Sequence, residues 1–251
     1  MSIEAPIQGL GGPVIRKFGN TGTRARQFIF GDDFARESIT PTGYPTLYTN
    51  TETGAAGTSS LDSGPNRVNL ITDSTGAGDD QDMRTSGLRI DRNYTSLITG
   101  MTMPEMQTST VQIDLPFVLT GALATEAFVG LHAAISALTG LPTTARHLGL
   151  YVDISVGANY MLSSSDGTAQ TTVDTTIPVD TNIHILRITW TGEDAATLQL
   201  YTAAGVAEGT GKTVTAFNVA SGASHDIHWF VHIETNSAKT MRVYPYRVAW
   251  T

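Results

Sequence analysis

The sequence predicts an all-β fold, in which an antiparallel β-sandwich follows an extended N-terminal arm. From Ser109 onward, short runs of β-branched and aromatic residues recur between turn residues at the spacing typical of sandwiches. Almost no segment has the capped 3.6-residue periodicity of an amphipathic helix. With 251 residues and no cysteine, the chain is long enough to bury a core without disulfides or metal.

The first 27 residues are expected to form the arm, because proline or glycine interrupts every stretch before a helix or strand can lengthen. Residues 1–26 hold four basic residues and one acidic residue, a charge of +3, which leaves 11 basic and 22 acidic residues, net −11, for the body. A basic arm suits docking on an acidic protein surface, whereas an acidic body repels nucleic-acid phosphates. A solvated tail is the alternative interpretation.

The body, residues 28–251, is predicted to be one sandwich domain. A first strand is expected over Phe28 to Phe34, followed by a loop-rich insertion at about 40–108. Thr, Ser, Gly, Asp and Pro dominate residues 40–87, and long structureless loops are uncommon in compact domains. We therefore expect either short strands within this stretch or packing against a neighbour, and the sequence leaves both open.

The strands of the C-terminal half follow from a period of two. Apolar residues alternate with polar ones over 111–117, and Leu148, Leu150 and Val152 share one face while Gly149 and Tyr151 share the other. The turn-forming Gly157 and Asn159 predict a hairpin into a strand at 160–163. Residues 122–138 have helix-favouring Ala and Leu content, but Phe128-Val129-Gly130 suits a buried strand, which we predict. Further strands are expected at 184–190, 197–201, 213–219, 226–234 and 240–250.

Four segments in this half carry a family resemblance. HILRITW at 184–190, LQLYTAAG at 198–205, WFVHIET at 229–235 and KTMRVYPYRVAW at 239–250 resemble, in spacing and residue class, the concanavalin A-like jelly roll. The resemblance covers about residues 109–251. It implies a jelly-roll sandwich, a fold that serves sugar-binding lectins, glucan hydrolases and the adhesive or capsid-associated modules of bacterial viruses. Fold alone does not choose among these functions.

No catalytic constellation is evident, so we expect no enzyme activity. Hydrolases of this fold place two glutamates and an aspartate at alternate positions of one strand, and the chain contains no Glu-x-Asp. The segment GVAEGTGKT at 205–213 departs from the spacing of a phosphate-binding loop and no helix follows it, so a flexible hairpin loop is expected. No Gly-x-Ser-x-Gly motif is present.

Histidines and aspartates offer the candidate binding residues. His225, His228 and His232 do not suit one metal ion, because His228 and His232 stand about 14 Å apart in a strand and His225 has the opposite parity. If their strands are neighbours, one sheet face collects residues able to stack on sugars or to form a subunit interface: His132, Tyr151, Asp153, His228, Phe230 and His232. Weak calcium candidates, with a solvated acidic loop as the alternative, are Asp73, Asp79, Asp80 and Asp82. No cofactor is expected.

The leading functional hypothesis is a non-enzymatic virion protein of a tailed bacteriophage, a cement or decoration protein on the capsid surface. Its partners would be the major capsid protein and further copies of itself, a trimer above all, and neither nucleic acid nor membrane. The predicted capsid-binding residues are Arg16, Lys17, Phe18, Arg24, Arg26 and Phe28. The alternative is a tail-fibre or receptor-binding adhesin that holds host polysaccharide through the sheet face or the loops at 40–87. An enzyme with an unrecognised site is the third hypothesis.

Overall fold

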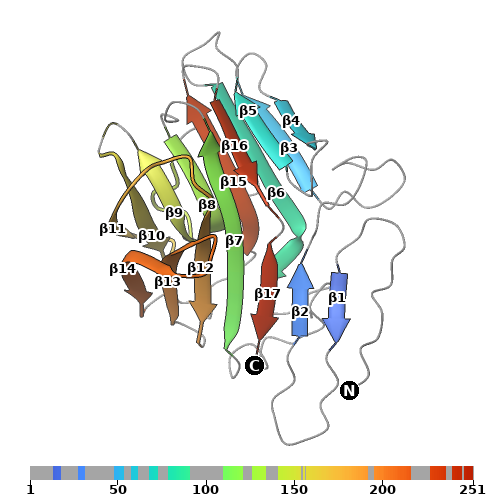
Figure 1. Cartoon of the computed structure of the whole chain (residues 1–251), viewed down its shortest axis with the longest axis vertical. Coiled ribbons are helices and arrows are strands. Elements are labelled where there is room, and N and C mark those ends of the chain that lie inside the picture. The colour runs from blue at the N-terminus through green and yellow to red at the C-terminus, as the bar shows by residue number, and fades with distance from the viewer. Residues whose placement is uncertain are drawn as a thin grey trace, which may run out of the picture.

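The computed structural model describes residues 14–17, 28–31, 48–53, 58–61, 68–72, 79–90, 110–120, 126–133, 141–153, 155, 157–191, 195–215, 227–235, 239–244 and 246–250. Every regular element in these ranges is a β-strand, and every strand pairing is antiparallel. The strands form two sheets that face each other (Figure 1), so the predicted all-β sandwich is confirmed. No helix in these ranges is long and apolar enough to cross a membrane.

The larger sheet has ten strands. Its main path runs in the order β1 (Val14–Lys17), β2 (Phe28–Gly31), β17 (Arg247–Trp250), β7 (Val111–Thr120), β12 (His184–Trp190), β13 (Ala196–Thr202) and β14 (Ala207–Val214). A branch leaves β7 through β16 (Lys239–Val243), which pairs with β5 (Val68–Thr72), and β5 pairs with β4 (Thr58–Leu61).

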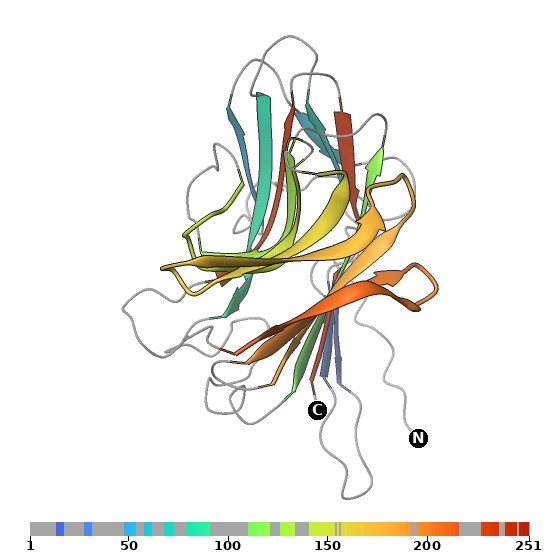
Figure 2. The ribbon, with the colours of Figure 1, turned by 90° about the vertical axis from the view of Figure 1, so that its left-hand side faces the viewer.

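The smaller sheet has seven strands. Their order is β11 (Gln170–Pro178), β10 (Asn159–Ser165), β9 (His147–Asp153), β8 (Glu126–His132), β15 (Ile227–Thr235), β6 (Asp79–Ile90) and β3 (Tyr48–Thr53). Figure 2 shows its strands bending across the other sheet. Four strands, β3 to β6, lie in the stretch expected to be loop-rich, which confirms the expectation of strands there. β6 pairs with β15 on one side and with the edge strand β3 on the other.

The core lies between the sheets and follows the predicted alternation. Ile113, Leu115 and Phe117 of β7 are buried, as are Leu148 and Leu150 of β9. The β9–β10 hairpin and the strand over 184–190 are confirmed, and β8 settles the choice between helix and strand in favour of a strand. Apolar side chains spaced by two therefore build both inner surfaces.

The predicted single strand at 240–250 is wrong, because the chain forms two strands along β7. β16 pairs with the second half of β7 and β17 with the first half. Between them Tyr244 N donates to Pro116 O at 3.0 Å, beside a proline that has no N–H to give to a ladder. The ladder therefore changes partner strand at Pro116.

The predicted hairpin loop at 205–213 is also wrong beyond its turn. Residues 203–206 make the turn, but Ala207–Val214 is strand β14, paired with β13. Of the strand predicted at 213–219, residues 213 and 214 belong to β14 and residue 215 follows it in a bend. Residues 216–219 lie outside the described ranges. Gly209 has φ +60°, and a Cβ there would overlap Thr175 O of β11, so only glycine fits where the two sheet edges meet.

β11 was missed because it is an edge strand with little apolar alternation. Its sequence, QTTVDTTIP, is mostly exposed along its length. Edge strands need no second buried face, and threonine suits them by its β-branched shape.

A glycine pair in the centre of the seven-stranded sheet gives a direct test of this packing. Gly130 and Gly149 are opposite each other on β8 and β9, and a Cβ on Gly130 would overlap the backbone of residues 148 and 149. We expect Gly130→Ala to lower the free energy of unfolding by about 1–3 kcal/mol, as overpacking does. Gly157→Ala is the matched control, since a Cβ there has nothing within 4 Å. Equal urea midpoints for both variants would contradict this packing.

Candidate functional site

The sheet face that we predicted for sugar stacking or a subunit interface required its strands to be neighbours, and they are. β9, β8 and β15 are adjacent, and the backbone register places Tyr151 opposite Phe128 and Phe128 opposite His232. In the same way His132 lies opposite His228. The face thus exists as a set of aligned backbone positions.

His132, however, is buried, and the prediction that it lines an open face is wrong. Its ring stacks on that of His147 at 6.0 Å and 18°, and Phe128 meets both rings edge-on at 5.9 and 5.8 Å. The glycine pair leaves room for this cluster, because a Cβ on Gly149 would meet the Phe128 ring at 2.5 Å. This end of the face is a small second core.

The segment over residues 141–146 covers this second core. Ser165 Oγ donates to Thr144 O at 3.0 Å, and Gln170 Nε2 donates to Pro142 O at 3.1 Å. Leu141 N donates to Glu126 Oε2 at 3.1 Å. These bonds fasten the segment to β8, β10 and β11.

His147 is held neutral beneath this cover. Its Nδ1 donates to Ala145 O at 2.7 Å, so its Nε2 accepts from the Ser163 hydroxyl at 2.7 Å. Gln170 Nε2 donates in turn to Ser163 Oγ at 2.9 Å. Burial lowers the pKa of His147 to about 4, against the weaker opposite effect of the Ala145 bond. The Ser163–His147 pair has the geometry of a nucleophile and base, but both residues are fully buried and out of reach of a substrate.

Two residues of the predicted face are partly exposed. Burial raises the pKa of Tyr151. Asp153 Oδ1 accepts from Ser155 N at 2.9 Å and from Ser155 Oγ at 2.6 Å, which closes the end of β9. His228, Phe230 and His232 are placed by the backbone of β15.

The other predicted site residues lie on sheet strands or outside the described ranges. Arg16 and Lys17 are on β1 and Phe28 begins β2. Asp79, Asp80 and Asp82 are on β6, so the expectation that they sit in an acidic loop is wrong. Outside the described ranges are Phe18, Arg24, Arg26, Asp73 and His225. Among described residues no group of three or more His, Asp or Glu side chains is arranged to hold a metal.

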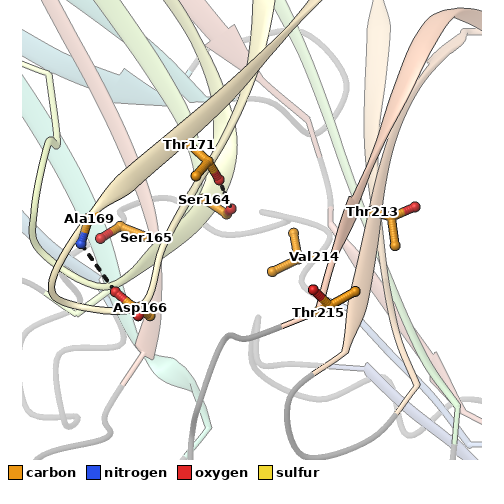
Figure 3. A pocket seen from close by; sticks show the side chains of 8 residues that line it. All are labelled: Ser164, Ser165, Asp166, Ala169, Thr171, Thr213, Val214 and Thr215. Carbon is orange, nitrogen blue, oxygen red and sulfur yellow. Dashed lines mark hydrogen bonds between the residues drawn. The ribbon is translucent and has the colours of Figure 1, made fainter.

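The structure instead opens a pocket where the β10–β11 hairpin faces the end of β14. Its volume is about 350 Å³, and Figure 3 shows the hairpin on one side of the gap and β14 on the other. Most of its wall carries hydroxyl or carboxyl groups. The lining residues are Ser164, Ser165, Asp166, Ala169, Thr171, Thr213, Val214 and Thr215.

Asp166 is the carboxylate of this pocket. Its Oδ1 accepts from Thr168 N at 2.8 Å and from Ala169 N at 3.2 Å, and these bonds lower its pKa. The Arg146 guanidinium donates from Nε and Nη2 to Asp166 O at 3.1 and 3.0 Å. The hairpin turn is thereby fixed, with an ionised carboxylate at the pocket wall.

Lys212 lies next to the pocket wall. The residue is 7% exposed, and its Nζ donates to Thr171 Oγ1 at 2.9 Å. Thr171 Oγ1 is also 3.1 Å from Ser164 Oγ. Burial lowers the pKa of Lys212. A cation from one sheet therefore reaches a hydroxyl pair on the other.

Sequence reasoning missed this pocket. Lys212 and Thr213 were considered as part of a phosphate-loop pattern, and the serines and threonines of β10 and β11 were not singled out. The available signal was the dense hydroxyl content of SSSDGTAQTT at 163–172. Without the pairing of β10 with β11 and the approach of β14, that content predicts only a turn.

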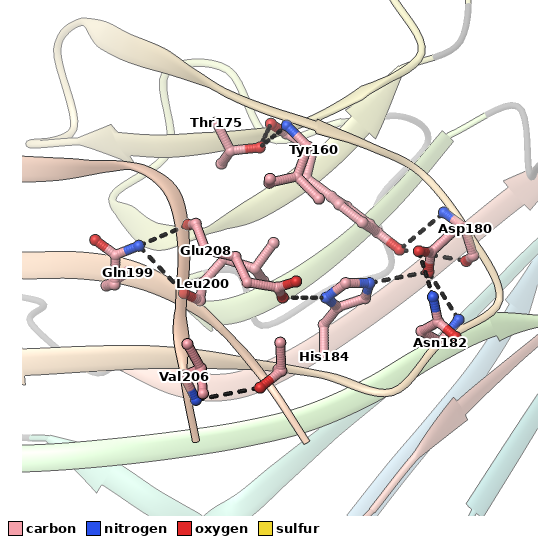
Figure 4. Close-up of polar contacts among 11 residues, drawn as sticks. Tyr160, Thr175, Asp180, Asn182, His184, Gln199, Leu200, Val206 and Glu208 are labelled. Carbon is pink, nitrogen blue, oxygen red and sulfur yellow. Dashed lines mark hydrogen bonds and ion pairs between the residues drawn. The ribbon is translucent and has the colours of Figure 1, made fainter. Parts of the chain in front are cut away.

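A second polar cluster lies where the β11–β12 loop meets β14. His184 is buried, with Nε2 2.9 Å from Asp180 Oδ1 and Nδ1 2.8 Å from Glu208 Oε2 (Figure 4). Both ring nitrogens donate to these carboxylates when the imidazole is positively charged. Burial raises the pKa of Asp180, but bonds from Asn182 N and His184 outweigh it and lower the pKa. The imidazole occupies the space between the two carboxylates, so the cluster fastens the loop to β14.

The comparisons with solved structures agree on the fold. A protein of unknown function from Shewanella oneidensis MR-1 is similar with TM-score 0.60 and 15% identity, covering 89% of this chain and 86% of that one. Peanut lectin with a 9mer peptide has TM-score 0.58 and 7% identity, and the match covers 90% of this chain and 98% of that one. The exoplasmic/lumenal domain of VIP36 in its Ca²⁺/Man3GlcNAc-bound form has TM-score 0.51 and 7% identity, and the match covers 81% of this chain and 83% of that one.

The chain has the concanavalin A-like, lectin-type jelly-roll sandwich. At these identities the likeness is one of fold. No family model and no curated protein matches the sequence.

The buried His147 predicts how stability depends on pH. Its pKa is 6.5 when exposed and about 4 in the folded protein, so the unfolded chain takes up the proton first as pH falls. The free energy of unfolding should therefore decrease from pH 6.5 down to about 4, by about 2 kcal/mol at pH 5. Urea unfolding at pH 7 and pH 5 measures this, with His147→Gln losing about 2 kcal/mol less than the wild type. The same pH dependence in both proteins would refute a buried neutral imidazole.

Proposed function

We propose that this protein is a non-enzymatic, carbohydrate-binding adhesin that holds a saccharide in the pocket between the β10–β11 hairpin and β14. The observation that carries the proposal is the wall of this pocket, in which five serine and threonine residues and the ionised carboxylate of Asp166 lie beside Ala169 and Val214. Its volume of about 350 Å³ is at the small end of the range for ligand pockets, about 300–1,000 Å³, and suits a sugar unit of a polymer.

The wall has the chemistry that sugars need. Sugar hydroxyls both donate and accept, and serine and threonine hydroxyls do the same. Asp166 accepts from sugar hydroxyls through charge-assisted bonds, while its Oδ1 stays anchored to the turn. The turn bonds hold the carboxylate in place before a ligand arrives, which reduces the entropy lost on binding.

Binding without bond cleavage agrees with the carboxylates of the described residues. Glycoside hydrolysis uses a pair of carboxyl groups flanking the bond, and Asp166 is the one acidic side chain among the described pocket residues. Asp180 and Glu208 are both engaged by His184. The fold adds support, since peanut lectin is a lectin by name and VIP36 has an oligosaccharide-bound form.

The test is glycan-array screening followed by calorimetric titration of the strongest ligand. Asp166→Asn keeps the acceptor oxygen for the turn but removes the charge, so we expect at least tenfold weaker binding, about 1.4 kcal/mol, with only a small decrease in melting temperature from the weaker turn bonds. Asp153→Asn removes a carboxylate from the predicted sheet face and serves as the control, with unchanged affinity. Loss of binding in Asp153→Asn alone would move the site to that face, and no saturable glycan binding would reject the proposal.

A second candidate function, virion decoration, is favoured by the position of β1 at the edge of its sheet. β1 ends the order of the ten-stranded sheet, pairs with β2, and has no further strand partner among the described residues. An edge strand can pair with a strand of another chain, and Arg16 and Lys17 give this one a positive charge. The partners would be the major capsid protein and further copies of the chain, with the protein located on the capsid surface.

Deleting residues 1–17 separates the two candidates. If the protein is a decoration protein, the deletion variant should no longer sediment with purified phage shells and should have the mass of a monomer. If it is an adhesin, the variant should keep its glycan affinity. Mass by light scattering and co-sedimentation measure the first, and titration measures the second. Unchanged association with the shells after the deletion would contradict capsid binding through residues 1–17.

A further inference from the structure

We infer that the saccharide held by this pocket is acidic, a uronate-type sugar whose carboxylate is bound at Lys212. The inference rests on the proposed carbohydrate function and names the ligand class of the same site. It is carried by a buried ammonium group that donates to Thr171, a residue of the pocket wall.

The first observation is the environment of Lys212. Its Nζ has three protons to donate, and the contact that the structure gives is to the neutral Thr171 hydroxyl at 2.9 Å. Among the described residues no carboxylate lies within ion-pair distance of this ammonium. A buried charge without a counter-ion is unfavourable, and burial accordingly lowers the pKa of this lysine.

The second observation is where this cation lies. Its partner Thr171 lines the pocket and contacts Ser164, which lines it too, so the ammonium is one hydroxyl group away from the pocket space. Figure 3 shows this hydroxyl pair on the hairpin side of the gap. A ligand carboxylate that replaces or joins the Thr171 contact supplies the missing counter-charge in a setting that water screens poorly.

The third observation is the charge around the pocket. The chain carries −8 overall, so a positive site is not a consequence of its general charge. Arg146 adds a second cation at the hairpin through its two bonds to Asp166 O. The Asp166 carboxylate opposes an anion, and we therefore place the ligand's hydroxyls at Asp166 and its carboxylate at the Lys212 side. An acidic sugar presents both groups on one ring.

A purely structural role for Lys212 is the alternative, since it ties β14 to β11. That role affects stability but gives no preference between charged and neutral polymers. The preference for a charged polymer therefore distinguishes the two roles.

The experiment titrates the full chain with polygalacturonate, alginate and hyaluronan, and with the carboxyl-reduced form of each. The inference expects at least one uronate polymer to bind tenfold or more tightly than its reduced form, with the difference shrinking between 50 and 500 mM salt, as screening requires. Lys212→Met keeps the aliphatic stem and should abolish the preference. Lys239→Met removes the same charge from β16, which pairs with β5 and β7, and should retain it.

Each other outcome overturns the inference in a recognisable way. If neutral glycans bind and no uronate polymer is preferred, the acidic ligand is rejected while the carbohydrate function stands. If the preference persists in Lys212→Met, the carboxylate is bound elsewhere. If no glycan of any kind binds, both proposals fail. The wild-type comparison of charged and reduced polymers decides the question even if Lys212→Met does not fold.

Discussion

The approach of two edge strands, β11 of one sheet and β14 of the other, is the constraint on which the site depends. Gly209 allows the backbone of β14 to approach Thr175, and Lys212 crosses to Thr171 further along the same pair of strands. His184, bridged to Asp180 and Glu208, ties the β11–β12 loop to the beginning of β14. The sheets are thus fastened along one edge, and the pocket between the β10–β11 hairpin and β14 lies along this same edge.

Part of the outer face of the seven-stranded sheet is filled by packed rings, whereas the proposed binding pocket lies at a sheet edge. The glycine pair on β8 and β9 admits the Phe128, His132 and His147 rings, and residues 141–146 close over them. His132, which the sequence assigned to a face for sugar stacking or subunit contact, is used for packing instead.

The sequence predicted the core well because the core obeys a short-range rule. An apolar residue at every second position of β7, β9 and β12 predicts both the strand and the face that packs in the core. This pattern can be recognised without knowing which strands pair with it. β11 and β14 escaped because edge strands rich in Thr and Gly resemble loops. The burial of His132 and the pocket beside Lys212 depend on strand register and on contacts between distant segments, which no local pattern encodes.

Sandwich folds of this type serve many functions, so the chemistry of the site must distinguish among them. Here that chemistry is a buried cation, a fixed carboxylate and a wall of hydroxyls between two sheets. A crystal structure of the protein soaked with galacturonic acid tests this account most directly. The account predicts a sugar between the β10–β11 hairpin and β14, with its carboxylate within 3.5 Å of Lys212 Nζ or Thr171 Oγ1. A sugar bound on the outer sheet face beside Tyr151, with the pocket holding only water, would contradict it.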